Sequence, residues 1–255
     1  MKTSRIFISA LLTEAVGILV ILVIWGGVST FYPPYIIPSP VETLKGISSE
    51  LPVGLSRHLV VTLYRILTGF LIAFLLGTFG GILSMLARAD KPVNSLMVAL
   101  QVVPGTILGV IFLLMFGIGS ATPILLVAFL TLPTLAINTT NGLSKRNTGT
   151  ENYLHSIKAS KWQIIRYSYL PALVPVIQSN LSLGISMAVK VVVLGEFIGS
   201  QDGLGYLLNR ARIIFNMQEV FIYLLLLMAF SLAFQAIQSL VFTVSLKKFV
   251  YPEAR

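Results

Sequence analysis

Six long runs of apolar residues constrain this chain more than any other feature of its sequence. They cover residues 11–31, 61–86, 93–116, 124–141, 174–198 and 221–246. A helix needs about 20 apolar residues to cross the hydrocarbon core of a bilayer, which is close to the length of each run. Since 56% of all residues are hydrophobic and only 11% are charged, the connecting segments leave no room for a large soluble domain. The sequence therefore predicts an all-α membrane protein with six transmembrane helices.

The basic residues lie between these runs and predict the orientation. Six spans place both termini on one side of the membrane, and cytoplasmic loops are the ones that carry an excess of Lys and Arg. If that side is the cytoplasm, it collects 12 of the 18 basic residues: Lys2, Arg5, Arg88, Lys91, Lys145, Arg146, Lys158, Lys161, Arg166, Lys247, Lys248 and Arg255. We therefore expect a multi-pass protein of the cell (inner or plasma) membrane with both termini in the cytoplasm.

The beginning of the chain is expected to stay in the mature protein. The first run continues without a small-residue cleavage site, so it is more typical of an uncleaved helix than of a signal peptide. Residues 1–35 are expected to form a cytoplasmic tail and the first span. Residues 36–255 should then form the main bundle.

Composition and motifs disfavour several classes of function. The net charge of +9 does not predict nucleic-acid binding, because the basic residues are separated by apolar runs instead of sharing one aqueous face. The chain has no cysteine, so it has no disulfide and no thiolate metal site. Its two histidines, His58 and His155, fall on opposite sides of the membrane, and neither H-E-x-x-H nor G-x-S-x-G occurs. We expect no catalytic, cofactor or metal site in this chain.

Proline predicts where helices begin and break. Ser39 followed by Pro40 is typical of a helix cap with proline at the first helical position, so a short helix on the outer surface should begin there. Pro104–Gly105 should break the third run, and Pro133 should bend the fourth.

Glycine predicts close packing and a second outer turn. Gly77 and Gly81 lie four residues apart, a spacing that lets another helix approach closely. The glycine-rich residues 199–212 are expected to form a turn and a short re-entrant or interfacial helix on the outer side.

A basic, amphipathic segment between the fourth and fifth runs is the first candidate for a functional site. In "ENYLHSIKASKWQIIRYSYLPALVP" (residues 151–175), apolar residues such as Ile157 and Trp162 recur at helical intervals, while Lys158, Lys161 and Arg166 occupy other faces. We expect the apolar side to face the protein's own bundle and the basic side to contact a partner. A helix resting on lipid headgroups and an unstructured cytoplasmic loop are the alternatives.

These residues resemble a known family. "IKASKWQIIRYSYLPALVP" is similar to the EAA loop of ABC-transporter permeases of the binding-protein-dependent importer type. "IIPSPVETL", "VVPGTILGVIFLLMFGIG" and "VVLGEFIGSQDGLGYLL" resemble the sulfonate, taurine and nitrate permease subfamily. The resemblance implies a type I ABC importer (MetI-like) permease core, with residues 147–170 as a cytoplasmic coupling loop. By this resemblance the residues that contact the ATPase are Glu151, His155, Lys158, Ala159, Ser160, Lys161 and Trp162.

The sequence departs from the family pattern at two places in this loop. The Glu-Ala-Ala triplet is Asn152, Tyr153 and Leu154 here, with an acid one position earlier at Glu151. The loop glycine is replaced by Lys158, and because side chains disfavour the turn that glycine allows, we expect the elbow to be tighter or more helical than in relatives.

Ionisable and amide residues inside the runs are candidates for a translocation path. A charge at the centre of a membrane helix costs about 2.5 to 3.5 kcal/mol, so it should face a cavity, a bundle interior or an opposite charge. We expect Lys190 to line the path and attract an anionic or electron-rich solute, and Glu196 to pair with Arg65 near an outer gate. Fixing of helix packing is the alternative for both, and for Lys190 a further alternative is that its side chain extends along the helix to the membrane interface. Gln101, Asn138 and Asn180 are weaker path candidates, since amides also join helices.

The resemblance implies an assembly around this chain. Its members work as pairs, so a second permease copy is expected, together with ATP-binding cassette ATPase subunits and an external solute-binding protein. No G-x-x-x-x-G-K followed by Ser or Thr occurs here, so ATP and Mg²⁺ should bind to the partner ATPase and the chain itself should be no enzyme. The solute would be a sulfonate-, taurine- or nitrate-like anion or a vitamin precursor. A secondary transporter driven by an ion gradient and a non-transporting membrane scaffold are the alternatives.

Overall fold

The computed structural model describes residues 16–17 and 19–250, and all regular elements in that part of the chain are helices. The chain divides into two compact units. The first unit comprises the described residues up to Leu55 together with Leu207–Ala229. The second unit comprises Ser56–Tyr206 and the residues from Phe230 onward.

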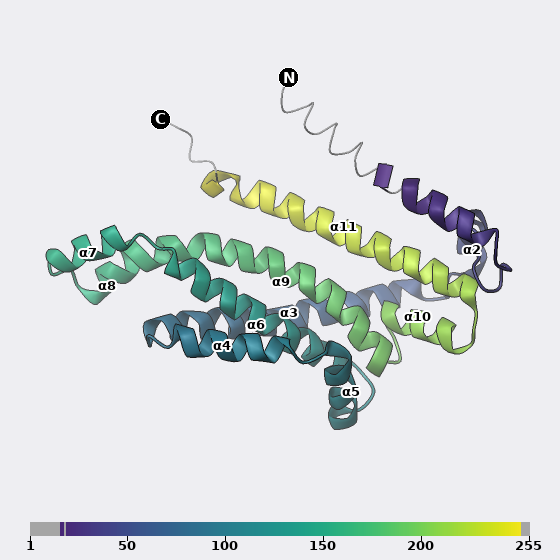
Figure 1. Cartoon of the computed structure of the whole chain (residues 1–255), viewed down its shortest axis with the longest axis horizontal. Helices are drawn as coiled ribbons and strands as arrows, with labels where there is room; N and C mark the ends of the chain where they lie inside the picture. The colour runs from purple at the N-terminus through teal and green to yellow at the C-terminus, as the bar shows by residue number, and fades with distance from the viewer. Residues whose placement is uncertain (1–15, 18, 251–255) are drawn as a thin grey trace, which may run out of the picture. The chain divides into compact units, whose positions relative to one another are not determined.

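The second unit contains most of the helices (Figure 1). In chain order they are α3 (Leu55–Leu86), α4 (Asp90–Gln101), α5 (Gly105–Phe116), α6 (Ala121–Ser144), α7 (Thr148–Ser156), α8 (Lys161–Ile164), the π-helical turn η1 (Ile165–Tyr169) and α9 (Leu170–Gly199). It also holds the start of α10 (Leu204–Ile213) and the later part of α11 (Met217–Val250).

Helix α6 lies in the core of the second unit. Its neighbour α3 approaches it through glycines: a Cβ atom on Gly77 would lie 2.7 Å from the carbonyl oxygen of Leu132, and one on Gly81 would lie 2.7 Å from Cβ of Thr139. These distances leave no room for a side chain. The predicted close packing at Gly77 and Gly81 is confirmed.

Within the part of the chain that the structure describes, four helices are long and apolar enough to cross a membrane. They are Leu55–Leu86, Ala121–Ser144, Lys161–Gly199 and Met217–Gln238, and they match the second, fourth, fifth and sixth predicted spans. The third predicted span consists of α4 and α5, which are bent by 85° at the break that Pro104 predicts; counted as one broken span, they make five. The first predicted span lies partly outside the described residues, where Leu19–Ser29 is an apolar helix too short to count. Six spans and cytoplasmic termini stay predictions.

The first unit contains a capped surface helix, α2 (Pro40–Glu50). Ser39 accepts a hydrogen bond from the backbone N–H of Glu42, and the Glu42 carboxylate accepts one from the backbone N–H of Ser39 at 2.9 Å, a reciprocal capping box. The predicted cap at Ser39 with Pro40 at the first position is confirmed. Hydrogen bonds from the Ser39 backbone and hydroxyl lower the pKa of Glu42 below its usual value.

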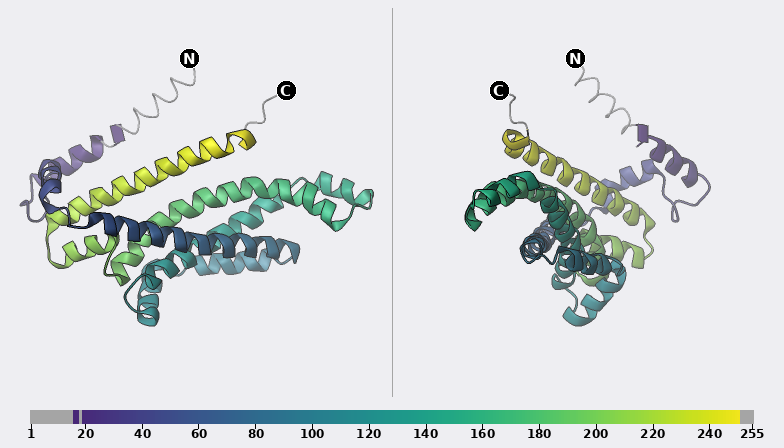
Figure 2. Two further views of the ribbon diagram at one scale, coloured as in Figure 1. Left: turned by 180° about the vertical axis from the view of Figure 1, so that it is seen from behind. Right: turned by 60° about the vertical axis from the view of Figure 1, so that its left-hand side comes forward.

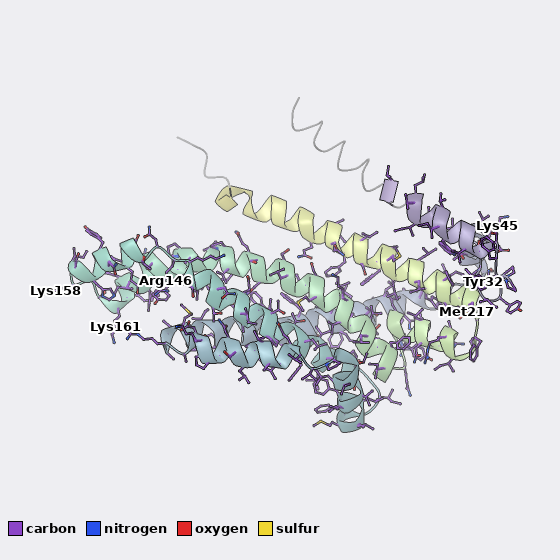
Figure 3. The ribbon with its side chains drawn as sticks, in the orientation of Figure 1. Tyr32, Lys45, Arg146, Lys158, Lys161 and Met217 are labelled. Atoms are coloured by element: carbon purple, nitrogen blue, oxygen red, sulfur yellow. The ribbon has the colours of Figure 1, made fainter. Side chains whose placement is uncertain are left out.

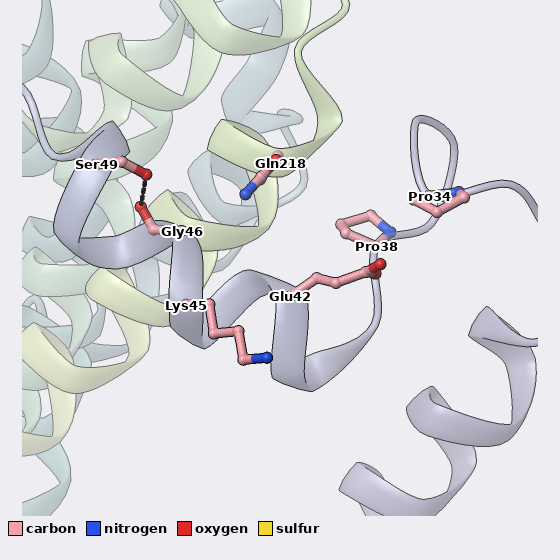
Figure 4. Close-up of a pocket in the computed structure, with 7 residues that line it drawn as sticks. All are labelled: Pro34, Pro38, Glu42, Lys45, Gly46, Ser49 and Gln218. Carbon is pink, nitrogen blue, oxygen red and sulfur yellow. Dashed lines mark hydrogen bonds between the residues drawn. The ribbon is translucent and has the colours of Figure 1, made fainter.

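Aromatic packing joins the parts of the first unit. The rings of Trp25 and Phe221 stack with their centroids 5.3 Å apart, and the Trp25 indole donates to the carbonyl of Pro38 at 3.0 Å. A pocket of about 340 Å³ lies beside α2 (Figure 4). Its lining residues are Pro34, Pro38, Glu42, Lys45, Gly46, Ser49 and Gln218.

Candidate functional site

The basic segment forms a helical hairpin, residues 145–170, called the basic hairpin below. It consists of α7, α8 and η1, and it projects at one end of the second unit beyond α3 and α4 (Figures 1 and 2). Lys158 and Lys161 lie at its tip, and Arg146 lies at its base (Figure 3).

The turn of the basic hairpin is built by local hydrogen bonds around Lys158. The backbone N–H of Lys158 donates to the carbonyl of His155 at 3.0 Å, and the backbone N–H of Ala159 donates to the carbonyl of Leu154 at 2.9 Å. This pair of bonds is the Schellman arrangement of a helix end. Lys158 takes φ of 54°, a left-handed conformation that usually requires glycine. Ser160 then caps α8, its hydroxyl accepting from the backbone N–H of Gln163. Helix α7 ends just before Lys158, and an elbow tighter or more helical than in relatives stays a prediction.

The exposed face of the basic hairpin combines apolar and basic side chains. Tyr153, Ile157 and Trp162 are 64%, 56% and 67% exposed, although large apolar side chains are usually covered. The expectation that Ile157 and Trp162 face the protein's own bundle is therefore wrong. His155, Ser160 and the two lysines at the tip are exposed as well, and Ala159 is half-buried. Apart from Glu151, the predicted coupling residues thus lie around one exposed or partly exposed surface.

Glu151 is engaged inside the chain. Its carboxylate accepts a hydrogen bond from Nε of Arg146 at 2.8 Å, and both side chains are less than one-fifth exposed. The guanidinium also donates to the carbonyl of Leu143 at 3.2 Å and lies 4.6 Å from the ring centroid of Tyr169. Sequence reasoning missed this role of Arg146 and Tyr169.

A polar stripe runs along one face of α9. Ser179, Ser186 and Lys190 are separated by two turns and one turn, so at about 100° per residue they share a face. Lys190 is exposed there and forms none of the ion pairs found among the described residues. The serines carry no signal in the sequence, because single hydroxyls are common in membrane helices.

The predicted amides join α6 to its neighbours. Asn138 donates to Ser179 at 3.0 Å and to Asn180 at 2.8 Å. Asn180 is fully buried and donates to Thr78 and Thr139 at 2.9 and 2.8 Å. These contacts are what the interhelical alternative expects, and a place of either amide on a translocation path stays a prediction.

The remaining amide candidate, Gln101, lies on the surface of α4. It is exposed, and its side chain donates to the hydroxyl of Thr134 on α6 at 3.0 Å. Thr134 is one turn before Asn138, so this contact extends the polar surface toward the break between α4 and α5.

A pocket of about 340 Å³ lies where the polar stripe meets the base of the basic hairpin. Asn138, Ser179, Lys145 and Arg146 give it a polar lining with basic side chains. Its other lining residues are Gly142, Ala172, Pro175 and Val176. Among the described residues, no three His, Cys, Asp or Glu side chains gather as metal ligands.

At the other end of α9, Glu196 forms the predicted ion pair with Arg65. Oε1 of Glu196 lies 3.0 Å from Nη1 of Arg65, so the pairing is confirmed. The same carboxylate accepts from the Thr62 hydroxyl at 2.9 Å and from the backbone N–H of Gly205 at 2.9 Å. Arg65 also pairs with Asp202, a contact that was not predicted from the sequence. The relation of this network to an outer gate stays a prediction.

The amino-acid sequence of the chain matches those of membrane transport proteins. Residues 65–243 match the family described as "Binding-protein-dependent transport system inner membrane component". The chain is 30% identical to the formylaminopyrimidine transport permease protein ThiX of Halalkalibacterium halodurans, over 87% of this chain and 90% of the relative. It is 30% identical to the putative aliphatic sulfonates transport permease protein SsuC of Bacillus subtilis, over 79% and 75%.

The fold has a counterpart among solved structures. A chain in inward-facing structures of the MetNI methionine ABC transporter superposes with a TM-score of 0.62 at 21% identity. The match covers 73% of this chain and 94% of the other.

Proposed function

Because the chain belongs to the family of binding-protein-dependent transport system inner membrane components, we propose that its basic hairpin docks an ATPase subunit whose closure opens a solute path along α6 and α9. The chain is a permease subunit of an ABC importer with a MetI-like fold. In this proposal, a separate partner subunit hydrolyses ATP.

The observation that carries the proposal is the exposed face of the basic hairpin. Trp162 is 67% exposed, next to Lys161 in the sequence, and both lie at the very start of the long helical stretch Lys161–Gly199. Lys158 and Lys161 are at the tip of the basic hairpin (Figure 3). Exposed aromatic residues ringed by basic ones are typical of a protein interface, because tryptophan contributes strongly when a partner's pocket encloses it. Lipid headgroups would attract the lysines, but they offer no such pocket.

The exposed polar stripe supports pairing with a second copy. Lys190 on α9 and Gln101 on α4 are exposed and Ser186 on α9 is partly exposed, and polar groups facing lipid are costly. A second permease copy would cover them and enclose a hydrated path between the two chains. The positive-inside distribution of Lys and Arg supports cytoplasmic termini and a cytoplasmic basic hairpin.

The solute is proposed to be small and to arrive on an external binding protein. The relatives are named for formylaminopyrimidine and aliphatic sulfonates, so a vitamin precursor and an organic anion are the two classes to test. Lys190 on the polar stripe favours the anion. The surface around α2, with its pocket beside Lys45, and residues 199–212 are the proposed docking region for the binding protein.

Reconstitution tests the proposal directly. The chain is co-expressed with the ATPase and binding-protein genes that neighbour its own, and the complex is placed in liposomes with ATP and Mg²⁺ inside. Uptake of radiolabelled taurine or thiamin-precursor pyrimidine that depends on ATP supports the importer, whereas uptake driven by an ion gradient without ATP contradicts it. Impermeant labelling of Lys158→Cys from outside intact cells would contradict the cytoplasmic hairpin.

A further inference from the structure

We propose that Arg146 is a positioning residue that fixes the basic hairpin to both α6 and α9, so that a push on the hairpin moves the membrane helices. The inference rests on the proposed docking of an ATPase and adds the element that transmits its movement. It also gives Glu151 a different role, as the counter-ion of Arg146 instead of a contact for the partner.

Three parts of the chain meet at the Arg146 guanidinium. Nε donates to Glu151 in the first turn of α7 at 2.8 Å, and Nη1 donates to the Leu143 carbonyl in the last turn of α6 at 3.2 Å. The ring of Tyr169, the last residue before α9, lies 4.6 Å from Cζ. A planar guanidinium can donate at its edge and stack through its face, and lysine cannot reproduce that combination.

A link from the basic hairpin to α9 matters because the helical backbone between α8 and α9 is irregular. Ile165–Tyr169 is a π-helical turn, a form that occurs mostly as single turns and often at functional sites. Pro171 and Pro175 follow it, and neither has a backbone N–H to donate. The Ser168 hydroxyl inside this turn is buried without a hydrogen-bond partner. The π-helical turn and the two prolines therefore mark the part of the continuous helix Lys161–Gly199 where we expect bending between the docking face and the span.

The other polar contacts of the basic hairpin are local. Within residues 145–170, the side-chain hydrogen bonds join residues at most five apart, and the longest is the one from Arg146 to Glu151. They shape the hairpin without fixing its angle to the spans. The contact of Arg146 with Tyr169 crosses from the base of α7 to the start of α9, and apolar contacts around Leu154 accompany it.

The charges around the joint agree with this role. Glu151 neutralises Arg146, and both side chains are more than four-fifths buried, so neither is presented to a partner. The exposed face keeps His155, Lys158, Lys161 and Arg166 without an acid among them. Docking and transmission thus use different side chains, and they can be separated by mutation.

The first experiment measures the joint in the chain by itself. The protein has no cysteine, so Ser95→Cys on α4 and Ser156→Cys on α7 can be spin-labelled without background. In nanodiscs, Arg146→Ala is expected to broaden the distance distribution between these labels, and Arg146→Lys to broaden it less. Lys91→Ala, at an exposed lysine outside the basic hairpin, is the control and should leave the distribution unchanged. An equally narrow distribution in Arg146→Ala would overturn the proposal whether or not the chain is an importer.

The second experiment measures transmission in the complex with the ATPase. Labels at Ser95→Cys and Ser182→Cys report movement of α4 against α9 when ATP, Mg²⁺ and vanadate trap the ATPase closed. In Arg146→Ala the ATPase should still co-purify and hydrolyse ATP. The fraction of molecules in which the distance between α4 and α9 changes on trapping should fall about tenfold, equivalent to about 1.4 kcal/mol of coupling. Glu151→Gln should give a smaller loss, because the Tyr169 contact remains.

The outcomes separate the two proposals. If the unmutated complex shows no shift on trapping, the proposed function fails while the label distances in the isolated chain still test the joint. If Arg146→Ala broadens the hairpin distances but the movement of α4 against α9 is as complete as in Lys91→Ala, Arg146 is only structural and the inference is wrong.

Discussion

The Glu196 carboxylate and the Arg65 guanidinium form an ion pair 3.0 Å long whose side chains are 0% and 1% exposed. The pair joins α3 to the end of α9, and hydrogen bonds from Thr62 and from the backbone N–H of Gly205 use the remaining capacity of the carboxylate. Buried charges are stable only when paired and hydrogen-bonded in this way. The network therefore holds the turn between α9 and α10 against α3.

Removing either charge should destabilise the protein, but by different amounts. Arg65→Met leaves Glu196 buried without its counter-ion and also frees Asp202, so a loss of about 3 to 5 kcal/mol in the free energy of unfolding is expected. Glu196→Gln leaves Arg65 paired with Asp202 and should cost less. Thermal unfolding in detergent measures both. Equal losses would show that Asp202 does not hold Arg65.

The glycines of α3 offer a matched pair for testing helix packing. A Cβ on Gly81 would meet Thr139 at 2.7 Å, whereas a Cβ on Gly80 would meet nothing within 4 Å. Gly81→Ala should therefore destabilise the protein by about 1 to 3 kcal/mol through overpacking. Gly80→Ala should be neutral or stabilise it by up to about 1 kcal/mol, because alanine favours helix. Similar melting temperatures for the two variants would contradict the close approach of α3 and α6.

The parts of the fold that the sequence predicted depend on local chemistry. Ser39 followed by Pro40 predicted the start of α2, because both residues act on the helix end next to them. The break at Pro104 follows from its missing N–H, and the close approach at Gly81 follows from its missing side chain. The pairing of Arg65 with Glu196 was found because two charges in apolar runs need partners.

The features that the sequence did not predict depend on long-range packing or on a change of helix phase. The exposure of Trp162 was missed because one continuous helix was assumed. The break at Lys158 and the π-helical turn shift the side chains after them to other faces. The link from Arg146 to Tyr169 joins the turn between α6 and α7 to the π-helical turn before α9, and no spacing rule identifies such a pair.

The Glu42 cap should make α2 sensitive to acid. Because its pKa is lowered in the folded state, Glu42 contributes stability that is complete above the usual value near 4.5 and is lost as the pH falls below it. The protection factors of α2 amides, which compare exchange with the intrinsic rate at each pH, should fall over that range in the unmodified protein. In Glu42→Gln the protection factors should be lower at neutral pH and should not fall further through this range. A parallel acid response in both proteins would assign the effect to another group.

Replacing Lys158 by glycine should stabilise the basic hairpin. Lys158 has φ of 54°, and a residue with a side chain costs roughly 1 kcal/mol in that conformation. Lys158→Gly should raise the free energy of unfolding by about that amount. Arg88 ends α3 with φ of 56°, so Arg88→Gly is a matched control that should show a similar gain. A loss of stability in Lys158→Gly alone would mean that the lysine side chain makes a stabilising contact.

The docking face predicts a separation of binding from stability. Trp162 is 67% exposed, so Trp162→Ala should leave the melting temperature of the isolated chain unchanged. If an ATPase encloses this side chain, the variant should weaken the complex by about 2 kcal/mol, roughly 30-fold in Kd.

Lys161→Glu should weaken the complex as well, and more strongly at low salt, because the charge at the tip of the basic hairpin would be reversed. Lys91→Glu alters an exposed lysine outside the basic hairpin and should retain full binding. Pull-down of the partner ATPase across a salt series measures all three variants, and equal retention by Trp162→Ala and Lys91→Glu would exclude the basic hairpin as the docking surface.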